Sequence, residues 1–320
     1  MKNFIDLLAI LALILLVSCN KEKEIKPSDF NGFWEQTLTE MNKNQIEFEK
    51  ISKDSIVEGK TISLYKIRSF QDVFFYAWIS EPVENGKFPV KIRFSGLDRS
   101  ITNKNEIKNF WFLKQKGFIN MLVDIRGQGL STEQMNPKEY ITEGIKNKEE
   151  YIYRGAFMDA VRSVDFISKN KKSNGKIIVT GGSQGAALAI AATALNDKIS
   201  LCIVGFPFLT DIPAYDKNNW PMKIFLHKAK NEKIDYFDLK GTLSYFDMLN
   251  FAEMINVPVF LRTEEYDDIT PKEGTIKFFN MLKYQKKVLY IEPCKGHGCS
   301  TNSIIANELE KTFIRTNINN

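Results

Sequence analysis

The 320-residue sequence predicts an α/β fold in which a mostly parallel central sheet is covered by helices on both faces. Short β-branched runs alternate with helix-like stretches from residue 90 to the end of the chain. The composition is that of a globular protein, with 43% hydrophobic and 12% aromatic residues. A chain of this length can form one large domain with a well-buried core. We therefore expect a single α/β domain.

The expected elements follow one another in a regular order. An amphipathic helix at 29–41 comes first, and the alternating runs "TISLYKIRS" and "VFFYAWIS" predict two antiparallel strands. Further strands are expected at 90–94, 120–125, 176–180, 200–205, 257–263 and 287–292, and helices at 149–169, 184–195, 272–282 and 300–315. The aromatic-rich stretch 209–247 is expected to form a small helical insertion over the carboxyl edge of the sheet, where such sheets bind ligands.

The beginning of the chain is typical of an export signal. Lys2 supplies a positive charge, and the apolar run from Leu7 to Val17 is shorter than the roughly 20 residues that span a bilayer. The letters "LVSC" resemble a bacterial lipoprotein signal, which implies that residues 1–18 are removed and that Cys19 is lipidated; a plain secretory signal with a chance cysteine is the alternative. Residues 19–28 would form a charged tether and 29–320 the single domain. The implied location is the bacterial cell envelope, with a lipid anchor in the membrane.

Charge, histidine content and cysteine content limit the classes of partner. The net charge is +5, from 44 basic and 39 acidic residues that are interspersed, so we expect no nucleic-acid partner. The chain has two histidines and no Cys-x-x-Cys pair, so we expect no metal site and no cofactor. Cys202 lies in an apolar run and is expected to be a buried thiol. Cys294 and Cys299 could form a local disulfide or remain free, and we expect free thiols.

The stretch "IIVTGGSQGAALAI" at 177–190 carries the strongest chemical signal. Ser183 lies between Gly181 and Gly185, after a β-branched run and before a run of strong helix formers. A serine at a sharp strand-to-helix turn is the arrangement of a nucleophile elbow, in which glycines allow strand and helix to pack closely. The alternative is a small residue in a glycine-rich turn. We expect Ser183 to be a catalytic nucleophile on an α/β-hydrolase fold.

The other members of a catalytic triad would follow in the order serine, acid, histidine. Of the two histidines, His227 lies in the insertion, whereas His297 follows the last strand in the loop "KGHGCS" and is the expected base. Carboxylates follow the preceding strand at 264, 265, 267 and 268. The letters "TPKE" predict a capped helix that begins at Thr270, which favours Asp267 as the acid, with Asp268 as the alternative.

Two backbone N–H groups are expected to bind the oxyanion of a tetrahedral intermediate. The N–H of Gln184 follows the nucleophile at the start of its helix. The N–H of Leu97 lies in "FSGLD", after the strand "VKIRF", and Gly96 lets this backbone approach the substrate. Phe206 and Phe208, after the strand at 200–205, are expected to form the wall of the acyl pocket.

Six segments in the same order give the chain a resemblance to the acetyl xylan esterase and cephalosporin C deacetylase family of carbohydrate esterases. They are "DFNGFWEQTL", "DIRGQG", "GGSQGA", "GFPFLTDIP", "TLSYFDMLNFAE" and "DDITP". The resemblance implies an Arg-Gly-Gln motif at Arg126, Gly127 and Gln128, whose arginine and glutamine would brace the loops around the elbow. It also supports Asp267 as the acid. Members of the family are often hexamers, so the resemblance also implies a possible homo-oligomer.

The resemblance and the motifs together predict a serine carboxylic ester hydrolase that removes acetyl groups from carbohydrate, such as acetylated xylan or cephalosporin-like acetyl esters. The chain departs from the family at Leu97, where a tyrosine is usual, and at Gly298, where a glutamate is frequent. These departures bear on the substrate and not on the reaction class. The alternatives are a serine peptidase, an esterase for longer acyl chains, and a carbohydrate-binding lipoprotein that has lost catalysis.

Overall fold

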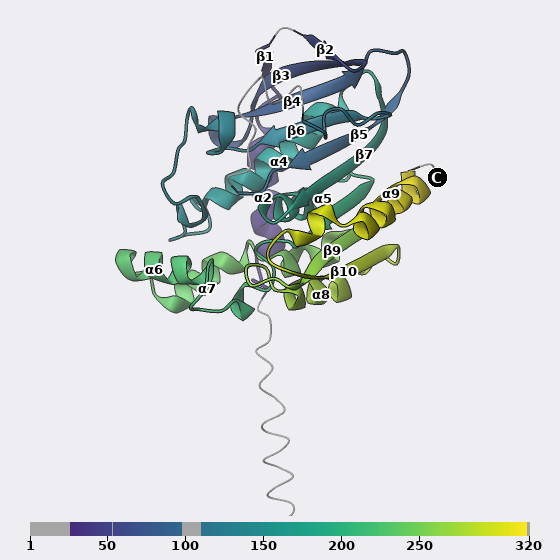
Figure 1. Ribbon diagram of the computed structural model, residues 1–320. Helices are drawn as coiled ribbons and strands as arrows, with labels where there is room; N and C mark the ends of the chain where they lie inside the picture. Colours follow the sequence, from purple (N-terminus) through teal and green to yellow (C-terminus); the bar gives the residue numbers. More distant parts are fainter. Residues whose placement is uncertain (1–25, 53, 98–109, 319–320) are drawn as a thin grey trace, which may run out of the picture.

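The computed structural model describes residues 26–52, 54–97 and 110–318. A ten-stranded sheet runs through this part of the chain, with the strand order β1-β3-β4-β6-β5-β7-β8-β9-β10 and with β2 paired to β3 (Figure 1). The strands are β1 (Phe48–Lys50), β2 (Ser55–Val57), β3 (Lys60–Arg68), β4 (Phe74–Pro82), β5 (Phe88–Phe94), β6 (Ile119–Asp124), β7 (Ser173–Gly182), β8 (Leu201–Gly205), β9 (Val259–Tyr266) and β10 (Lys287–Lys295).

The sheet changes character along its width. Strands β1 to β4 pair antiparallel, and β4 also runs antiparallel to β6. From β6 through β5, β7, β8 and β9 to β10 all pairs are parallel. The carboxyl ends of these six strands therefore meet at one edge, as the sequence predicted for a mostly parallel sheet with an antiparallel start.

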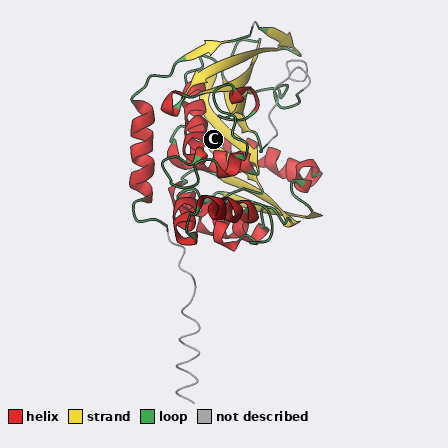
Figure 2. Ribbon diagram, turned by 90° about the vertical axis from the view of Figure 1, so that its left-hand side faces the viewer, coloured by secondary structure: helices red, strands yellow, loops and turns green. Residues whose placement is uncertain are grey.

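Helices cover both faces of the sheet, and Figure 2 shows them on either side of the strands. The α-helices are α2 (Phe30–Asn42), α4 (Ile152–Ser168), α5 (Gln184–Leu195), α6 (Met222–Glu232), α7 (Tyr236–Ser244), α8 (Lys272–Met281) and α9 (Ile304–Ile318). Short 3₁₀ turns are η1 (Phe70–Asp72), η2 (Gly129–Thr132), η3 (Tyr140–Thr142), η4 (Ile212–Ala214), η5 (Met248–Met254) and η6 (Cys299–Asn302). The segment between β8 and β9 contains α6 and α7, which is the helical insertion that the sequence predicted.

The core is divided by the sheet. The larger part packs α2, α4, α5 and α8 against one face, where Trp34, Phe157 and Ile92 belong to one buried cluster. On the other face, Ile314 of α9 packs with Phe260 of β9. Apolar burial on two sides explains why the central strands are near-continuous hydrophobic runs.

Most expected elements agree with the structure to within a few residues, and α5 agrees at both ends. The cap expected at Thr270 and one helix start were wrong. Helix α8 begins at Lys272, as the expected range 272–282 has it, but it has no side-chain cap; the hydroxyl of Thr270 instead donates a hydrogen bond to Asp267. Helix α9 begins at Ile304, since the residues before it form η6. No helix in the described ranges has both the length and the apolar character needed to cross a membrane.

Candidate active site

Ser183 stands at the turn between β7 and α5 in a conformation that residues other than glycine rarely adopt. Its φ is 56° and its ψ is −124°. A backbone conformation of this kind costs on the order of 1–3 kcal/mol and persists where the surrounding structure enforces it. The turn places Ser183 at the carboxyl edge of the sheet, which is the geometry of a nucleophile elbow.

Glycines around Ser183 make this turn possible. A Cβ on Gly181 would overlap the carbonyl oxygen of Gly185, and a Cβ on Gly185 would overlap the carbonyl oxygen of Phe94. A Cβ on Gly182 would lie 2.7 Å from the ring of Phe206. The first two contacts are with backbone atoms, so no side-chain movement could relieve them.

His297 lies in the loop between β10 and η6, where its ring meets a carboxylate. Its Nδ1 is 2.8 Å from Oδ2 of Asp267. The same carboxylate accepts a hydrogen bond from the hydroxyl of Thr270 at 2.7 Å, and its Oδ1 accepts from the N–H groups of Ile269 and Thr270 at 2.9 and 3.1 Å. These bonds fix the orientation of Asp267, and Asp267 in turn fixes that of the imidazole.

The electrostatics of Asp267 favour its ionised form. Burial raises the pKa of this carboxyl, but the hydrogen bonds and charge of His297 and the hydrogen bonds from Thr270 outweigh burial and leave the pKa below its ordinary value. Asp268, the alternative acid, is exposed and has no hydrogen bond or ion pair with any residue that the structure describes. The structure therefore places Asp267, and not Asp268, against His297.

The loop that carries His297 is tied down at several points. Cys294 and Cys299 form a disulfide across it. The expectation of free thiols was wrong, because the loop folds back and brings the two cysteines together. The N–H of Gly296 donates to the carbonyl of Tyr266 at 2.8 Å, which links the loop to β9.

Glu264 on β9 forms hydrogen bonds to η6, the turn that follows this loop. Its Oε1 accepts hydrogen bonds from the hydroxyl and the N–H of Ser300 at 2.7 and 3.2 Å. The carboxylate is buried, and burial raises its pKa despite the hydrogen bonds from Ser300. Asp267 raises the pKa of Glu264 further. A buried carboxylate thus holds Ser300, three residues after His297.

Ser183 and His297 line one cavity of about 760 Å³ at the carboxyl edge of the sheet. Its wall also includes Leu97, Phe206 and Trp220. In the described parts of the chain no hydrogen bond joins the hydroxyl of Ser183 to the imidazole, and catalytic hydrogen bonds of this kind often tighten only around a substrate. A second hollow of about 950 Å³ opens around Arg162 and away from these residues.

Of the two expected oxyanion donors, Gln184 follows Ser183 at the start of α5 and Leu97 lines the cavity. Gln184 is the first residue of α5, and its side-chain oxygen accepts a hydrogen bond from the hydroxyl of Tyr153 at 2.9 Å. Leu97 lines the cavity in the loop after β5, and this loop touches the elbow where Phe94 meets Gly185. Neither the N–H of Gln184 nor that of Leu97 has an acceptor within the described ranges, and their role as oxyanion donors stays a prediction.

The two expected pocket aromatics have different positions. Phe206 lines the cavity and packs edge-on against His297, with ring centroids 5.0 Å apart. Phe208 is buried behind Trp220, on which it stacks at 5.4 Å. The wall residue at this place is therefore Trp220, and the expectation for Phe208 was wrong. The aromatic-rich insertion was the available signal, but its sequence could not show which ring faces the cavity.

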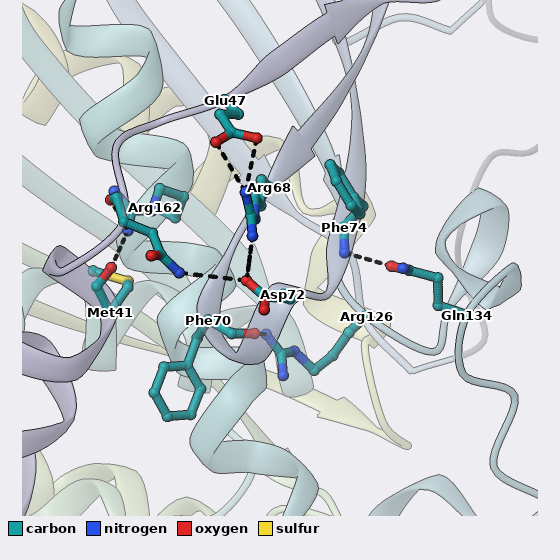
Figure 3. A network of polar contacts seen from close by, with 10 residues as sticks. Met41, Glu47, Arg68, Phe70, Asp72, Phe74, Arg126, Gln134 and Arg162 are labelled. Carbon is teal, nitrogen blue, oxygen red and sulfur yellow. Dashed lines mark hydrogen bonds and ion pairs between the residues drawn. The ribbon is translucent and has the colours of Figure 1, made fainter.

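Arg126 and Gln128 are buried outside the cavity wall. The guanidinium of Arg126 bonds to both oxygens of Asp159 on α4, at 2.8 and 2.9 Å, and to the carbonyl of Phe70 at 2.9 Å. Figure 3 shows Arg126 beside Phe70. Because α4 also carries Tyr153, which holds Gln184, this ion pair connects the Arg-Gly-Gln loop to the helix that supports the elbow.

The remaining expected residues lie away from the cavity. His227 is exposed on α6, where its Nε2 lies 3.0 Å from the side-chain nitrogen of Asn231. Cys202 is buried, and burial raises the pKa of its thiol to about 12. Within the described residues no group of three or more histidine, cysteine or acidic side chains could hold a metal ion. Cys19 lies outside the described residues.

The sheet order, the elbow at Ser183 and the His297–Asp267 pair define the class of the protein, which is an α/β-hydrolase. The family model for acetyl xylan esterase matches residues 9–308. The chain belongs to the acetyl xylan esterase family, and the resemblance found in the sequence is confirmed.

Two individual relatives are similar to parts of this chain. Acetyl esterase Axe7A of Xylanibacter ruminicola is 26% identical over 294 residues, which cover 87% of this chain and 65% of that relative. A prolyl endopeptidase of Dictyostelium discoideum is 24% identical over 222 residues, or 64% of this chain and 27% of that protein. The chain thus spans 65% and 27% of the lengths of these two relatives.

Solved structures show the same fold. Acetyl xylan esterase 1 from Thermoanaerobacterium sp. JW/SL YS485 has a TM-score of 0.78 at 21% identity, with 92% of this chain and 95% of that chain covered. The acetyl xylan esterase from Paenibacillus sp. R4 has a TM-score of 0.76 at 23% identity, with 91% and 95% covered.

Proposed function

We propose that this protein is a serine esterase that removes acetyl groups from carbohydrate. The observation that carries the proposal is the arrangement around one cavity: Ser183 on a strained elbow and His297 on an ionised Asp267, with two unused backbone N–H groups beside them. Acyl transfer needs a nucleophile, a base and donors for an oxyanion, and this cavity offers all three. Membership of the acetyl xylan esterase family supports acetyl as the acyl group.

In the first half of the reaction, the hydroxyl oxygen of Ser183 attacks the acetyl carbonyl and gives its proton to Nε2 of His297. The N–H groups of Gln184 and Leu97 stabilise the negative oxygen of the tetrahedral intermediate. The intermediate collapses when its bond to the sugar oxygen breaks, and His297 returns the proton to that oxygen. The products of this step are a free sugar hydroxyl and an acetylated Ser183.

In the second half, water attacks the acetyl carbonyl on Ser183 and gives a proton to His297. A second tetrahedral intermediate forms on the same N–H groups. It releases acetate when Ser183 leaves and takes back its proton. Asp267 remains ionised in both halves and stabilises the positively charged imidazole, which its lowered pKa favours.

The cavity of about 760 Å³ is larger than an acetyl group requires and is within the range of small-molecule sites. The extra space suits a sugar on the alcohol side of the ester. Among the alternatives, an esterase for longer acyl chains would need this space on the acyl side, and a peptidase would cleave amides. A binding protein that has lost catalysis would not need the intact set of Ser183, His297 and Asp267.

The test is a series of 4-nitrophenyl esters followed by acetylated xylo-oligosaccharides. We expect kcat/KM to fall by about 5- to 150-fold for each methylene that the packed acyl pocket does not fit. Leu97→Tyr adds a ring at the pocket and should sharpen the preference for acetyl. A wild-type enzyme that prefers butyryl or octanoyl esters, or that cleaves peptides and leaves acetyl sugars intact, would contradict the proposal.

We also propose that Cys19 carries a lipid that anchors the protein in the bacterial cell envelope. The apolar run that ends at Val17 and the cysteine that follows Ser18 support the proposal. Cys19→Ser should move the protein from the membrane fraction of cells to the soluble fraction. A Cys19→Ser protein that stays with the membranes would contradict it.

A further inference from the structure

Arg93 is a charged residue in the cavity wall that the proposed reaction does not use. It lies on β5, two residues before Ser95, and lines the same cavity as Ser183 and His297. Its register partner on β7 is Thr180, on the face of the sheet that α9 covers. Strand β5 carries Arg93 and leads into the loop with Leu97, so the same strand positions the guanidinium and the expected oxyanion donor.

Arg93 has no counterion in the described ranges. Glu310, whose charge acts on Arg93, forms its ion pair with Lys91 instead, at 3.3 Å. The neighbouring Arg262 bonds to Asn307 instead. Within the described part of the chain, the guanidinium of Arg93 contacts the ring of Trp111, whose centroid lies 5.4 Å from Cζ. None of the five N–H donors of this side chain has an acceptor among the described residues.

The environment makes this charge costly to leave unpaired. Burial lowers the pKa of Arg93, and the positive charge of Arg262 lowers it further, while Glu310 opposes both effects. An arginine remains protonated in proteins even so. The described part of the cavity wall contains no aspartate or glutamate. The described part of the cavity wall thus presents the positive charge of Arg93 and no negatively charged side chain to a ligand.

A guanidinium is planar and offers parallel N–H groups that match the two oxygens of a carboxylate. The ring of Trp111 contacts the guanidinium of Arg93, and no described residue accepts a hydrogen bond from its N–H groups, which could therefore form such a pair. Because an acetyl group is uncharged, a carboxylate in the substrate must belong to the alcohol part of the ester. This argument rests on the proposed acetyl esterase function.

We propose that Arg93 binds a carboxylate on the alcohol part of the substrate, so that the enzyme selects acetyl esters of acidic carbohydrates such as those that contain a uronic acid. Arg93 determines specificity and takes no part in the transfer of the acetyl group. Neutral acetyl esters are substrates of the same site, with weaker binding.

The test compares two substrates that differ by one charge, 4-acetoxybenzoate and its neutral methyl ester. The measured quantity is the ratio of kcat/KM for the anionic ester to kcat/KM for the neutral ester. In Arg93→Gln we expect this ratio to fall by about 10- to 100-fold, chiefly through KM, since hydrogen bonds to a charged group have this strength. Arg93→Lys keeps the charge and should retain most of the ratio.

Arg262→Gln is the matched control, because Arg262 lies on the same face of the sheet but outside the cavity wall. The ratio for Arg262→Gln should stay much closer to that of the wild-type enzyme than the ratio for Arg93→Gln, because Arg262 acts on the cavity only through its charge. A second test uses the wild-type enzyme alone. Benzoate should inhibit hydrolysis of the neutral ester at a concentration at least tenfold lower than the concentration of benzamide that gives the same inhibition. Equal inhibition by benzoate and benzamide would contradict the inference.

Other outcomes are equally decisive. An unchanged ratio in Arg93→Gln, or equal losses for both esters, would show that Arg93 only supports Trp111. If Arg93→Gln lowers kcat/KM only for the hydrogen succinate ester of 4-nitrophenol, the bound carboxylate lies on the acyl side of the ester. This result would overturn the assignment. A wild-type enzyme that hydrolyses neither benzoate-derived ester nor 4-nitrophenyl acetate would instead overturn the proposed function.

Discussion

Two adjacent aspartates show how the environment of a single residue decides its chemistry. Asp267 is buried and its carboxylate accepts hydrogen bonds from Thr270 and Ile269 as well as His297. Asp268 is exposed to solvent one residue later. The difference arises because the chain after β9 turns Asp267 back toward the His297 loop. The two aspartates therefore have different expected roles, although their side chains are chemically the same.

Asp267→Asn should lower kcat/KM for 4-nitrophenyl acetate by on the order of 10⁴-fold, since an amide can neither hold the imidazole in the required tautomer nor stabilise its charge. Asp268→Asn, measured in parallel, should change kcat/KM by less than about threefold. Steady-state kinetics of the two purified variants checks this prediction. A larger loss in Asp268→Asn than in Asp267→Asn would move the acid by one residue.

At the scale of an element, three sets of contacts fix the loop between β10 and η6, which carries His297. They are the Cys294–Cys299 disulfide, the Glu264–Ser300 hydrogen bonds and the bond from Gly296 to β9. The glycines on either side of His297 have φ values of 104° and 80°, in the region that favours glycine. A loop of this kind would be mobile without its ties, and the base would lose its alignment.

The double variant with Cys294→Ser and Cys299→Ser should lose about 2 kcal/mol of stability, the value expected for opening so short a loop. Its kcat/KM should fall several-fold because His297 is held less firmly. Dithiothreitol should lower the activity of the wild-type enzyme in the same way and leave the double variant unchanged. Wild-type activity that does not respond to full reduction of the disulfide would contradict a positioning role.

The order of elements could be predicted from the sequence because buried strands and helices leave strong apolar patterns. The alternating run at 61–69 and the apolar run at 177–179 are examples, and the elbow after the second run follows from its glycines. Contacts between distant segments could not be predicted. Examples of such contacts are the hydrogen bond from Thr270 to Asp267, the disulfide around His297 and the stacking of Trp220 on Phe208.

At the scale of the whole molecule, buried carboxylates make stability depend on pH. Asp124 at the end of β6 is buried, and burial raises its pKa to about 7. Its Oδ2 accepts one long hydrogen bond from the N–H of Leu130, at 3.3 Å, and its Oδ1 has no partner among the described residues. Burial likewise raises the pKa of Asp247 to about 6. Both groups hold a proton more tightly in the folded state than in the unfolded state.

The sign of the effect follows from this difference. Between the ordinary aspartate pKa of about 4 and the folded value of about 7, the folded protein binds the proton of Asp124 and the unfolded chain does not, so the free energy of unfolding falls as pH rises. The contribution of Asp124 is fully present at lower pH and is lost by about pH 7. Its size is on the order of 4 kcal/mol for a shift of this magnitude.

Asp124→Asn removes the charge and keeps the shape, so its free energy of unfolding relative to the wild-type protein should increase between pH 4.5 and pH 8. Urea unfolding at a series of pH values measures this difference. Asp197→Asn, at an exposed position, is the control and should follow the wild-type pH dependence. A difference between Asp124→Asn and the wild-type protein that stays constant over this range would contradict the assignment.

The central claim is that Ser183 forms an acetyl-enzyme in the cavity that it shares with His297. The most direct measurement is the rate of acetate release from acetylated xylo-oligosaccharide by the wild-type enzyme, Ser183→Ala and Ser95→Ala, a second serine of the same cavity wall. We expect Ser183→Ala to lose on the order of 10⁴- to 10⁶-fold in kcat while it keeps the wild-type unfolding transition, and Ser95→Ala to lose far less. Folded Ser183→Ala protein that releases acetate at a rate near that of the wild-type enzyme would contradict the claim.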